Sequence, residues 1–218
     1  MKFQRNNCLL YAITMPHRPG MRPLEEQVRE ALDAGITMLQ LREKYLSEED
    51  FLREALSIRK LTERYHVPLI INDSLYVAIN SGADGIHIGQ SDLPAREVRA
   101  KLGPDKILGV TAKTVAQALE AEKAGADYLG SGAVFPSPTK TDAIPMSRET
   151  LTAICQSVSI PVVAIGGINA SNLSTLAGTG IAGAAIISGI FGQPDIGAAV
   201  RELRECIHKN HRVIPAVL

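Results

Sequence analysis

The stretch Leu39-Gln-Leu-Arg-Glu-Lys44 carries the clearest signal for both the fold and the site. It continues an apolar run of strand length, and the side chains of a strand point to opposite faces in turn. Gln40, Arg42 and Lys44 therefore point the same way at the carboxyl end of a predicted strand. Two cations and an amide on one face favour a ligand with strong negative charge.

Similar short apolar runs recur along the chain, and a stretch with helical spacing or helix-boundary residues follows each of them. The predicted strands cover residues 9–14, 37–42, 67–72, 85–88, 106–110, 128–130, 161–165 and 182–187. The predicted helices cover residues 23–34, 48–65, 73–81, 94–101, 114–124, 148–158, 170–177 and 196–207. Strand and helix thus alternate eight times without interruption.

This alternation predicts an α/β fold of one specific kind. The runs are apolar on both faces, which is typical of a parallel sheet covered by helices. Eight units fit a closed (β/α)8 TIM barrel. An open Rossmann sheet is the alternative, but it usually needs fewer strands, and no GxGxxG follows the first strand here. We find no linker or low-complexity tract, so we expect residues 1–218 to form a single TIM-barrel domain.

Composition limits the partners that the chain can have. The 218 residues carry a formal net charge of zero, so no basic excess favours nucleic acid or anionic lipid as a partner. The three cysteines lie far apart, which favours reduced thiols in the cytoplasm. We find neither an apolar run of about 18 residues nor the long apolar core of a signal peptide. We expect a cytoplasmic protein with small-molecule partners, and its oligomeric state stays open.

The predicted carboxyl ends of the strands gather most of the polar residues of interest. In barrels of this class, catalytic groups lie at those ends and in the loops that follow. The residues found there are Gln40, Arg42, Lys44, Asn72, Asp73, His87, Gln90, Asp92, Thr111, Ser137, Thr139, Lys140, Gly166, Gly167, Ile187, Ser188 and Gly189. The amino ends of the strands show no comparable group.

Asp73 and Asp92 form a candidate metal site. They follow adjacent strands, and Mg²⁺ prefers a few carboxylates together with substrate phosphates and water. An aspartate at a strand–helix junction can instead serve as a helix N-cap. We favour the metal because the pair lies beside Arg42 and Lys44, which suit an anionic ligand.

Gly166-Gly167 and Ser188-Gly189 form a candidate monophosphate site. Glycine lets backbone N–H groups approach a phosphate, and a helix N-terminus adds to the attraction. The alternative is that these are plain turn glycines. Two anion sites on one rim, one with a metal, point to a transferase that joins two phosphorylated substrates and releases diphosphate.

Two further residues have alternative interpretations. The sequence does not decide whether His87 has a structural or a catalytic role, and Lys140 could be a solvated lysine.

The chain resembles the thiamine-phosphate synthase family along nearly all its length. The order of its QxRxK, ND and HxGQxD elements is the specific signal. The matching segments are Leu39-Gln-Leu-Arg-Glu-Lys44, Ile71-Asn-Asp73, Ala83-Asp-Gly-Ile-His-Ile-Gly-Gln-Ser-Asp-Leu93, Gly109-Val-Thr111, Ala126-Asp-Tyr-Leu-Gly130, Pro136-Ser-Pro-Thr-Lys140, Ala164-Ile-Gly-Gly-Ile168 and Ile186-Ile-Ser-Gly-Ile190.

The resemblance implies a reaction and a role for each matching residue. Such an enzyme condenses 4-amino-2-methyl-5-hydroxymethylpyrimidine diphosphate with a thiazole phosphate, giving thiamine phosphate and diphosphate. Diphosphate would leave first, assisted by Mg²⁺. The metal ligands would be Asp73 and Asp92, and the catalytic cations Arg42, Lys44 and Lys140. The pyrimidine diphosphate would contact Gln40, Arg42, Lys44, Asn72, Thr111 and Lys140, and the thiazole phosphate Ser137, Thr139, Gly167, Ile187 and Ser188.

The chain departs from the family pattern in places, and other functions remain as alternatives. Ser74 stands where many members carry a charged residue, and Thr111 stands where serine is common. A thiazole tautomerase shares the barrel and the monophosphate site but needs no diphosphate clamp. A phosphosugar isomerase or epimerase would want a catalytic carboxylate or cysteine pair, and none is evident. A non-catalytic regulator that binds a thiamine intermediate would not need an intact pair of metal ligands.

Overall fold

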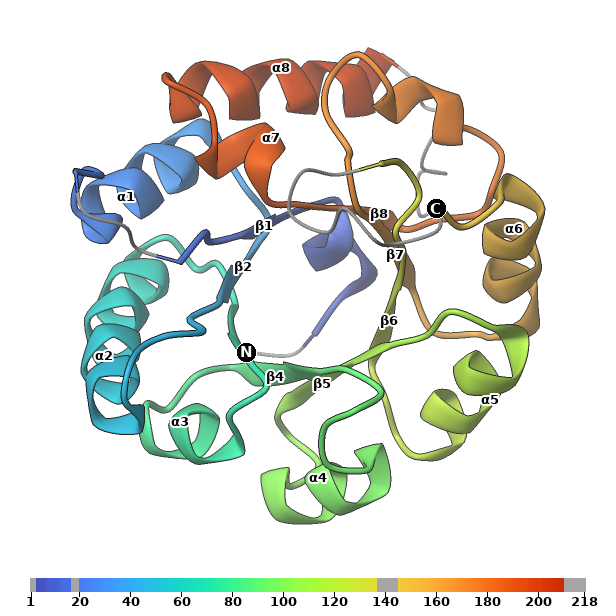
Figure 1. Cartoon of the computed structure of the whole chain (residues 1–218), viewed down its shortest axis with the longest axis horizontal. Helices are drawn as coiled ribbons and strands as arrows, with labels where there is room; N and C mark the ends of the chain where they lie inside the picture. Colours follow the sequence, from blue (N-terminus) through green and yellow to red (C-terminus); the bar gives the residue numbers. More distant parts are fainter. Residues whose placement is uncertain (1–2, 17–19, 137–144, 210–218) are drawn as a thin grey trace.

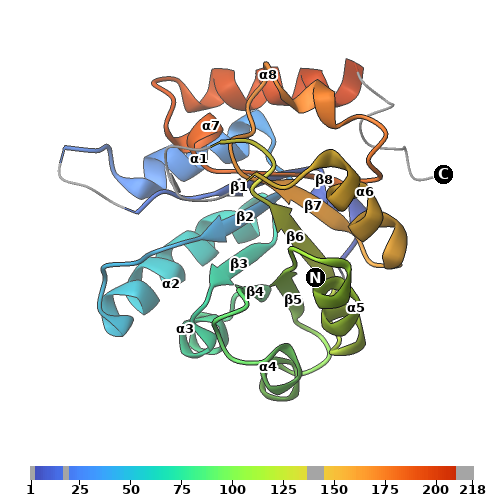
Figure 2. The ribbon, with the colours of Figure 1, turned by 45° about the vertical axis from the view of Figure 1, so that its right-hand side comes forward.

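The computed structural model describes residues 3–16, 20–136 and 145–209. Eight parallel strands pair in chain order, and β8 pairs with β1 to close a barrel (Figure 1). Helices surround this ring of strands on the outside, as the turned view also shows (Figure 2). The predicted (β/α)8 TIM barrel is confirmed.

The strands are short, and each falls inside or close to its predicted run. They are β1 (Leu10–Ile13), β2 (Met38–Leu41), β3 (Leu69–Asn72), β4 (Gly85–Ile88), β5 (Ile107–Thr111), β6 (Tyr128–Gly132), β7 (Val162–Ile165) and β8 (Gly183–Ile186). In the register, Gln40 of β2 lies opposite Ile13 of β1 and Ile70 of β3. The polar end of β2 is therefore held between two neighbouring strands.

The helices follow the strands in alternation. They are α1 (Leu24–Ala34), α2 (Glu48–Arg64), α3 (Leu75–Asn80), α4 (Ala95–Leu102), α5 (Val115–Lys123), α6 (Arg148–Ser157), α7 (Ser188–Phe191) and α8 (Ile196–Lys209), with the 3-10 helices η1 (Arg5–Cys8) and η2 (Leu173–Leu176). Ser47 caps α2 by accepting a hydrogen bond from the Asp50 N–H, as its position in the sequence predicts. The short α7 lies between β8 and α8 and was not predicted.

The helix predicted over residues 170–177 is wrong. Only the 3-10 turn η2 forms there. The side chain of Asn169 accepts hydrogen bonds from the backbone and hydroxyl of Ser171, and the Asn172 amide donates to the Gly167 carbonyl. Such local side-chain bonds offer the backbone an alternative to a helix.

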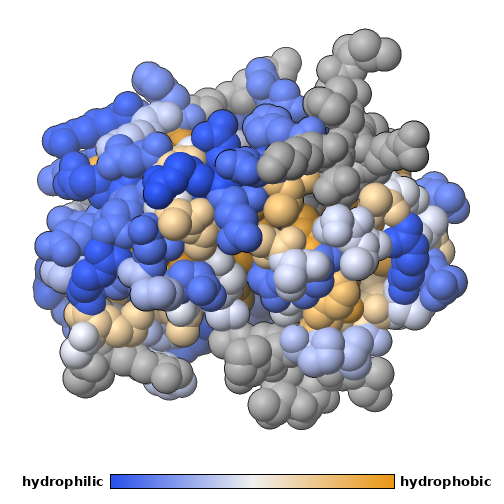
Figure 3. Space-filling model, turned by 90° about the horizontal axis from the view of Figure 1, so that it is seen from above, coloured by the Kyte–Doolittle hydropathy of each residue, from blue (hydrophilic) through white to orange (hydrophobic). Residues whose placement is uncertain are grey.

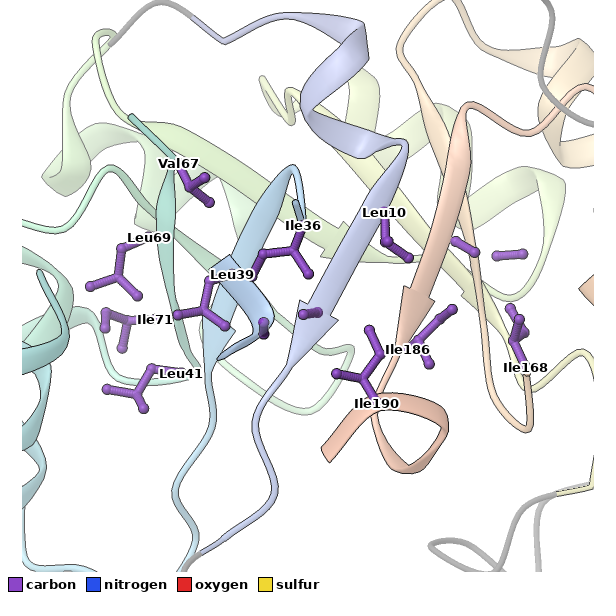
Figure 4. Packing of buried hydrophobic residues seen from close by; sticks show 14 of the residues in the cluster. Leu10, Ile36, Leu39, Leu41, Val67, Leu69, Ile71, Ile168, Ile186 and Ile190 are labelled. Carbon is purple, nitrogen blue, oxygen red and sulfur yellow. The ribbon is translucent and has the colours of Figure 1, made fainter. Parts of the chain in front are cut away.

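Two apolar cores hold the barrel together. The larger lies between the strands and the helices, and Figure 4 shows part of it, including Leu39, Leu41, Leu69 and Ile71. The smaller fills the interior of the barrel. Its buried members are Cys8, Tyr11, Ile13, Met38, Ile70, Ile107, Tyr128, Val163, Ala182 and Ala185. Successive strand residues thus alternate between the two cores, which is why the strands are apolar on both faces.

The outer surface is mixed in polarity. In the coloured part of Figure 3, hydrophilic side chains gather mainly on the left, and apolar areas lie nearer the centre. Within the part of the chain that the structure describes, no helix is long and apolar enough to cross a membrane.

Candidate functional site

A cavity of about 340 Å³ opens at the carboxyl ends of the strands. Its walls come from all eight strands of the barrel, so the fold gathers residues from distant parts of the sequence. Eight of the residues with a predicted substrate or metal role line it: Gln40, Arg42, Lys44, Asn72, Asp73, Asp92, Thr111 and Ile187. β2 ends at Leu41, and the alternation of side chains nonetheless continues through Arg42 and Lys44, as the sequence predicts.

Asp73 lies at the centre of the polar side of this cavity. One of its carboxylate oxygens is 2.5 Å from Lys44 Nζ, and the other accepts a hydrogen bond of 2.5 Å from Asn72 Nδ2. The φ of Asp73 is 63°, in the left-handed region that few residues other than glycine adopt. This backbone conformation turns the chain sharply after β3, and such strain is often found at functional sites.

Asp92 belongs to the tight turn after β4. One oxygen of its carboxylate accepts a hydrogen bond of 2.6 Å from the backbone N–H of Gly89. The N-cap residues of the helices that follow β3 and β4 are Ser74 and Pro94. Neither Asp73 nor Asp92 is therefore the N-cap of its helix. Ser74, which departs from the family pattern, caps α3 by accepting a hydrogen bond from the Val77 N–H.

The donor atoms in this cavity fit a hard cation that keeps several coordination positions open for water or substrate. Among residues 3–16, 20–136 and 145–209, no group of three His, Cys, Asp or Glu side chains comes together that could enclose a metal alone. Asp73 and Asp92 supply two carboxylates to one cavity. The side-chain amide oxygen of Asn72, Oδ1, is buried beside them and has no hydrogen-bond partner in the described part of the chain. Mg²⁺ is usually bound in this way, with water and substrate phosphates completing its shell.

A row of hydrogen-bonded side chains forms the floor of the cavity. Gln40 Nε2 donates to the Tyr11 hydroxyl at 2.5 Å, and the hydroxyls of Tyr11 and Tyr128 are 2.8 Å apart. His87 Nδ1 is 3.0 Å from the Tyr128 hydroxyl, and His87 Nε2 is 3.0 Å from Thr111 Oγ1. The five residues come from β1, β2, β4, β5 and β6, and all but Thr111 are buried.

Burial fixes the protonation states on this floor. It lowers the pKa of His87 to about 4, so the imidazole is neutral at physiological pH. It raises the pKa of Tyr11 and of Tyr128, so both phenols keep their protons. The floor therefore carries polarity without net charge, whereas the wall formed by Arg42, Lys44 and the aspartates carries the charges.

A second, smaller hollow of about 20 Å³ adjoins the cavity. Gly167, Ile187 and Ser188 line it, and Gly166 and Ile187 also line the larger cavity. Gly167 has a φ of 66°, and a Cβ at this position would lie 2.4 Å from the Pro136 carbonyl oxygen. Glycine is therefore required at position 167 by close packing against the backbone of residue 136, and the phosphate role of the glycine pair stays a prediction. Ser188 begins α7, but this helix is only one turn long.

Three predicted site residues, Ser137, Thr139 and Lys140, lie outside the described residues, so their placement stays a prediction. The structure adds Tyr11, Tyr128 and Lys113 to the cavity region. Lys113 follows Thr111 by two residues, and this is the same alternation that identified Arg42 and Lys44. The two tyrosines gave no comparable signal, because they lie 117 positions apart in the sequence and meet only when the barrel closes.

Comparison with known proteins agrees with this geometry. The sequence model of a family described as thiamine monophosphate synthase matches residues 10–190. The thiamine-phosphate synthase of Ruminiclostridium cellulolyticum is 51% identical over 196 residues, which cover 90% of this chain and 93% of that protein. The thiamine-phosphate synthase of Clostridium tetani is 48% identical, covering 90% of this chain and 94% of that protein.

A solved structure is similar as well. It is the thiamine phosphate pyrophosphorylase from Pyrococcus furiosus, which superposes with a TM-score of 0.85 at 39% sequence identity. The match covers 94% of this chain and 98% of that one. The similarity therefore extends over the barrel as a whole and includes every strand that carries a site residue.

Proposed function

Because the chain belongs to the thiamine monophosphate synthase family, we propose that it condenses the pyrimidine diphosphate with the thiazole phosphate and releases diphosphate. The observation that carries this proposal is the sharing of one cavity by two cations and two carboxylates, next to a glycine-lined hollow. A diphosphate suits the first group of residues, and a monophosphate suits the hollow. The thiazole phosphate and its carboxylated form would both fit this description.

The pyrimidine diphosphate would bind along β2, β3 and β5. Arg42 and Lys44 would hold its diphosphate, with Lys140 added from the loop after β6. Gln40, Asn72 and Thr111 would contact the substrate from the cavity wall and floor. The thiazole phosphate would bind to Gly167, Ile187 and Ser188, with Ser137 and Thr139 from the same loop as Lys140. The two reacting groups would then meet between the cation cluster and the hollow.

In the proposed reaction, the C–O bond between the pyrimidine methylene and the diphosphate breaks, and its electron pair leaves with the diphosphate. The lone pair of the thiazole nitrogen then forms the new C–N bond, which makes the ring a thiazolium. Negative charge grows on the diphosphate oxygens as the bond breaks. Three cations, Arg42, Lys44 and Lys140, would therefore stabilise the transition state more than the ground state. This difference accelerates the step.

Asp73 and Asp92 would hold Mg²⁺, and the bound ion would neutralise part of the charge on the diphosphate. The unpartnered side-chain oxygen of Asn72, Oδ1, suits a metal-bound water or a polar group of the substrate. The thiazole nitrogen attacks through a lone pair and has no proton to lose, so the step needs no strong general base. The neutral, fully hydrogen-bonded His87 agrees with such a site.

A product assay tests the proposal. The purified chain is incubated with both substrates and Mg²⁺, and thiamine phosphate and diphosphate are quantified. We expect the two products in equal amounts, with none when either substrate is omitted. A thiazole tautomerase or a non-catalytic binding protein would release no diphosphate, and that result would overturn the proposal.

A further inference from the structure

The row of hydrogen bonds under the cavity has a direction. Gln40 donates through its amide nitrogen to the oxygen of Tyr11. Buried hydroxyl protons almost always find an acceptor, so the proton of Tyr11 passes to the Tyr128 oxygen. The proton of Tyr128 then points at His87 Nδ1. Each oxygen in the row accepts one hydrogen bond and donates the next.

This order fixes the tautomer of His87. A neutral imidazole carries one proton, and the nitrogen that accepts cannot carry it. Since Nδ1 accepts from Tyr128, the proton is on Nε2, which donates to Thr111 Oγ1 at 3.0 Å. The hydroxyl of Thr111 has then received its hydrogen bond from the protein, and its own proton remains for a ligand. Thr111 lines the cavity, so that proton is available there.

The backbone makes room for this arrangement. A Cβ on Gly109 would lie 2.3 Å from the Tyr128 hydroxyl and 2.5 Å from His87 Nδ1, so any other residue at that position would disrupt the contact. A Cβ on Gly130 would lie 3.0 Å from the His87 ring. Both glycines belong to strands and face the barrel interior. The bond between Tyr128 and His87 is therefore built into β5 and β6 as well as into the two side chains.

We propose that Tyr11, Tyr128 and His87 are positioning residues, which orient the Thr111 hydroxyl as a hydrogen-bond donor toward the pyrimidine ring of the substrate. The inference rests on the proposed function for the identity of the ligand. Ring nitrogens of a pyrimidine can only accept hydrogen bonds, so a hydroxyl with a fixed, outward proton suits them. These three residues act at a distance, through Thr111, and need not touch the reacting atoms.

The tautomer can be measured on the ligand-free chain. The sequence has five histidines, so replacing His17, His66, His208 and His211 by glutamine leaves His87 as the single imidazole. Two-bond proton–nitrogen correlation spectra of the labelled protein then show which ring nitrogen is protonated. A proton on Nε2 supports the inference. A proton on Nδ1, which would mean the reverse order of donors, or a doubly protonated ring overturns it.

Kinetics test whether the row acts through Thr111. Tyr128→Phe removes the donor to His87 and should raise the KM for the pyrimidine diphosphate about fivefold to tenfold, with the KM for the thiazole phosphate unchanged. In a Thr111→Val background the same substitution should add nothing, whereas additive effects would overturn the positioning role. Thr111→Ser, unlike Thr111→Val, should leave the KM for the pyrimidine diphosphate close to that of the unmodified chain, because it keeps the hydroxyl. Phe3→Leu, next to the Tyr128 ring, is the packing control.

The failure of this inference and the failure of the proposed function are distinguishable. If the unmodified chain makes no thiamine phosphate, the proposed function fails. If it turns over normally while His87 carries its proton on Nδ1, only the inference fails. Should Tyr128→Phe not fold, the tautomer measurement decides, because it leaves the row itself unaltered.

Discussion

The Lys44 ammonium lies 2.5 Å from a carboxylate oxygen of Asp73, so the two groups neutralise each other in the ligand-free cavity. In the proposed complex the two groups have different partners: Lys44 binds the diphosphate, and Asp73 binds Mg²⁺. The contact must therefore open, or be shared, when substrate and metal bind.

Replacing Lys44 by methionine separates these two roles. We expect turnover to fall about 100-fold, because a cation that stabilises the leaving group is lost. We also expect Mn²⁺, used as a spectroscopic substitute for Mg²⁺, to bind the ligand-free variant more tightly, since Asp73 is no longer occupied. Titration by electron paramagnetic resonance measures this affinity. Weaker metal binding in the variant would contradict the competition between Lys44 and the metal.

Asp92→Ala tests the second carboxylate. It should lower kcat/KM at least about 100-fold and raise the Mg²⁺ concentration needed for half-maximal activity. The matched control is Asp105→Ala, an exposed aspartate in the loop before β5, which should leave both quantities unchanged. The measurement is initial rate against Mg²⁺ concentration, after treatment with EDTA to remove bound metal. An unaltered Mg²⁺ dependence in Asp92→Ala would remove this residue from the metal site.

Lys140→Ala tests a role that rests on the sequence alone. As a stabiliser of the leaving diphosphate, Lys140 should affect kcat more than the KM of either substrate. We expect a fall in kcat of about 10-fold to 100-fold. Lys101→Ala, an exposed lysine on α4, is the matched control. A change confined to KM would make Lys140 a binding residue only.

Glu54 on α2 should make the stability of the chain depend on pH. Burial, with a smaller contribution from Glu43, raises the pKa of Glu54 from its ordinary 4.5 to about 7. Between these values the folded chain binds more protons than the unfolded chain, so the free energy of unfolding falls as pH rises and then levels off above about pH 7. Urea denaturation should find Glu54→Gln more stable than the unmodified chain at pH 8 and little changed at pH 4.5.

The control for that experiment is Glu49→Gln, which alters an exposed glutamate on the same helix. It should leave the pH dependence of the unmodified chain in place. If Glu54→Gln keeps the same fall in stability between pH 5 and pH 7, another group is responsible.

Local patterns in the sequence were sufficient to predict the barrel. Ser47 and Ser147 cap their helices, and such a cap can be read from sequence because it depends only on residues three positions apart. The ends of the strands shift by one or two residues, since pairing with both neighbours decides where a strand begins. The helix over residues 170–177 was predicted wrongly because Asn169 and Asn172 bind the backbone locally.

The charged wall of the cavity could also be predicted, but only Gln40 and Thr111 of its floor were given a role from the sequence. Alternation after β2 identified Gln40, Arg42 and Lys44, and the same rule applied after β5 would have found Lys113. The pairing of Tyr11 with Tyr128 depends on closure of the barrel, which no local pattern reports. His87 was left open for the same reason, because its two hydrogen-bond partners lie on β5 and β6.

The most direct test of the central claim is a crystal structure of the chain with Mg²⁺, diphosphate and thiamine phosphate. We predict the diphosphate and the metal between Arg42, Lys44, Asp73 and Asp92, and the phosphate of thiamine phosphate at Gly167 and Ser188. Both ligands would then occupy one mouth of the barrel, with the new C–N bond between them. Diphosphate bound elsewhere, or a metal that touches neither aspartate, would contradict the account.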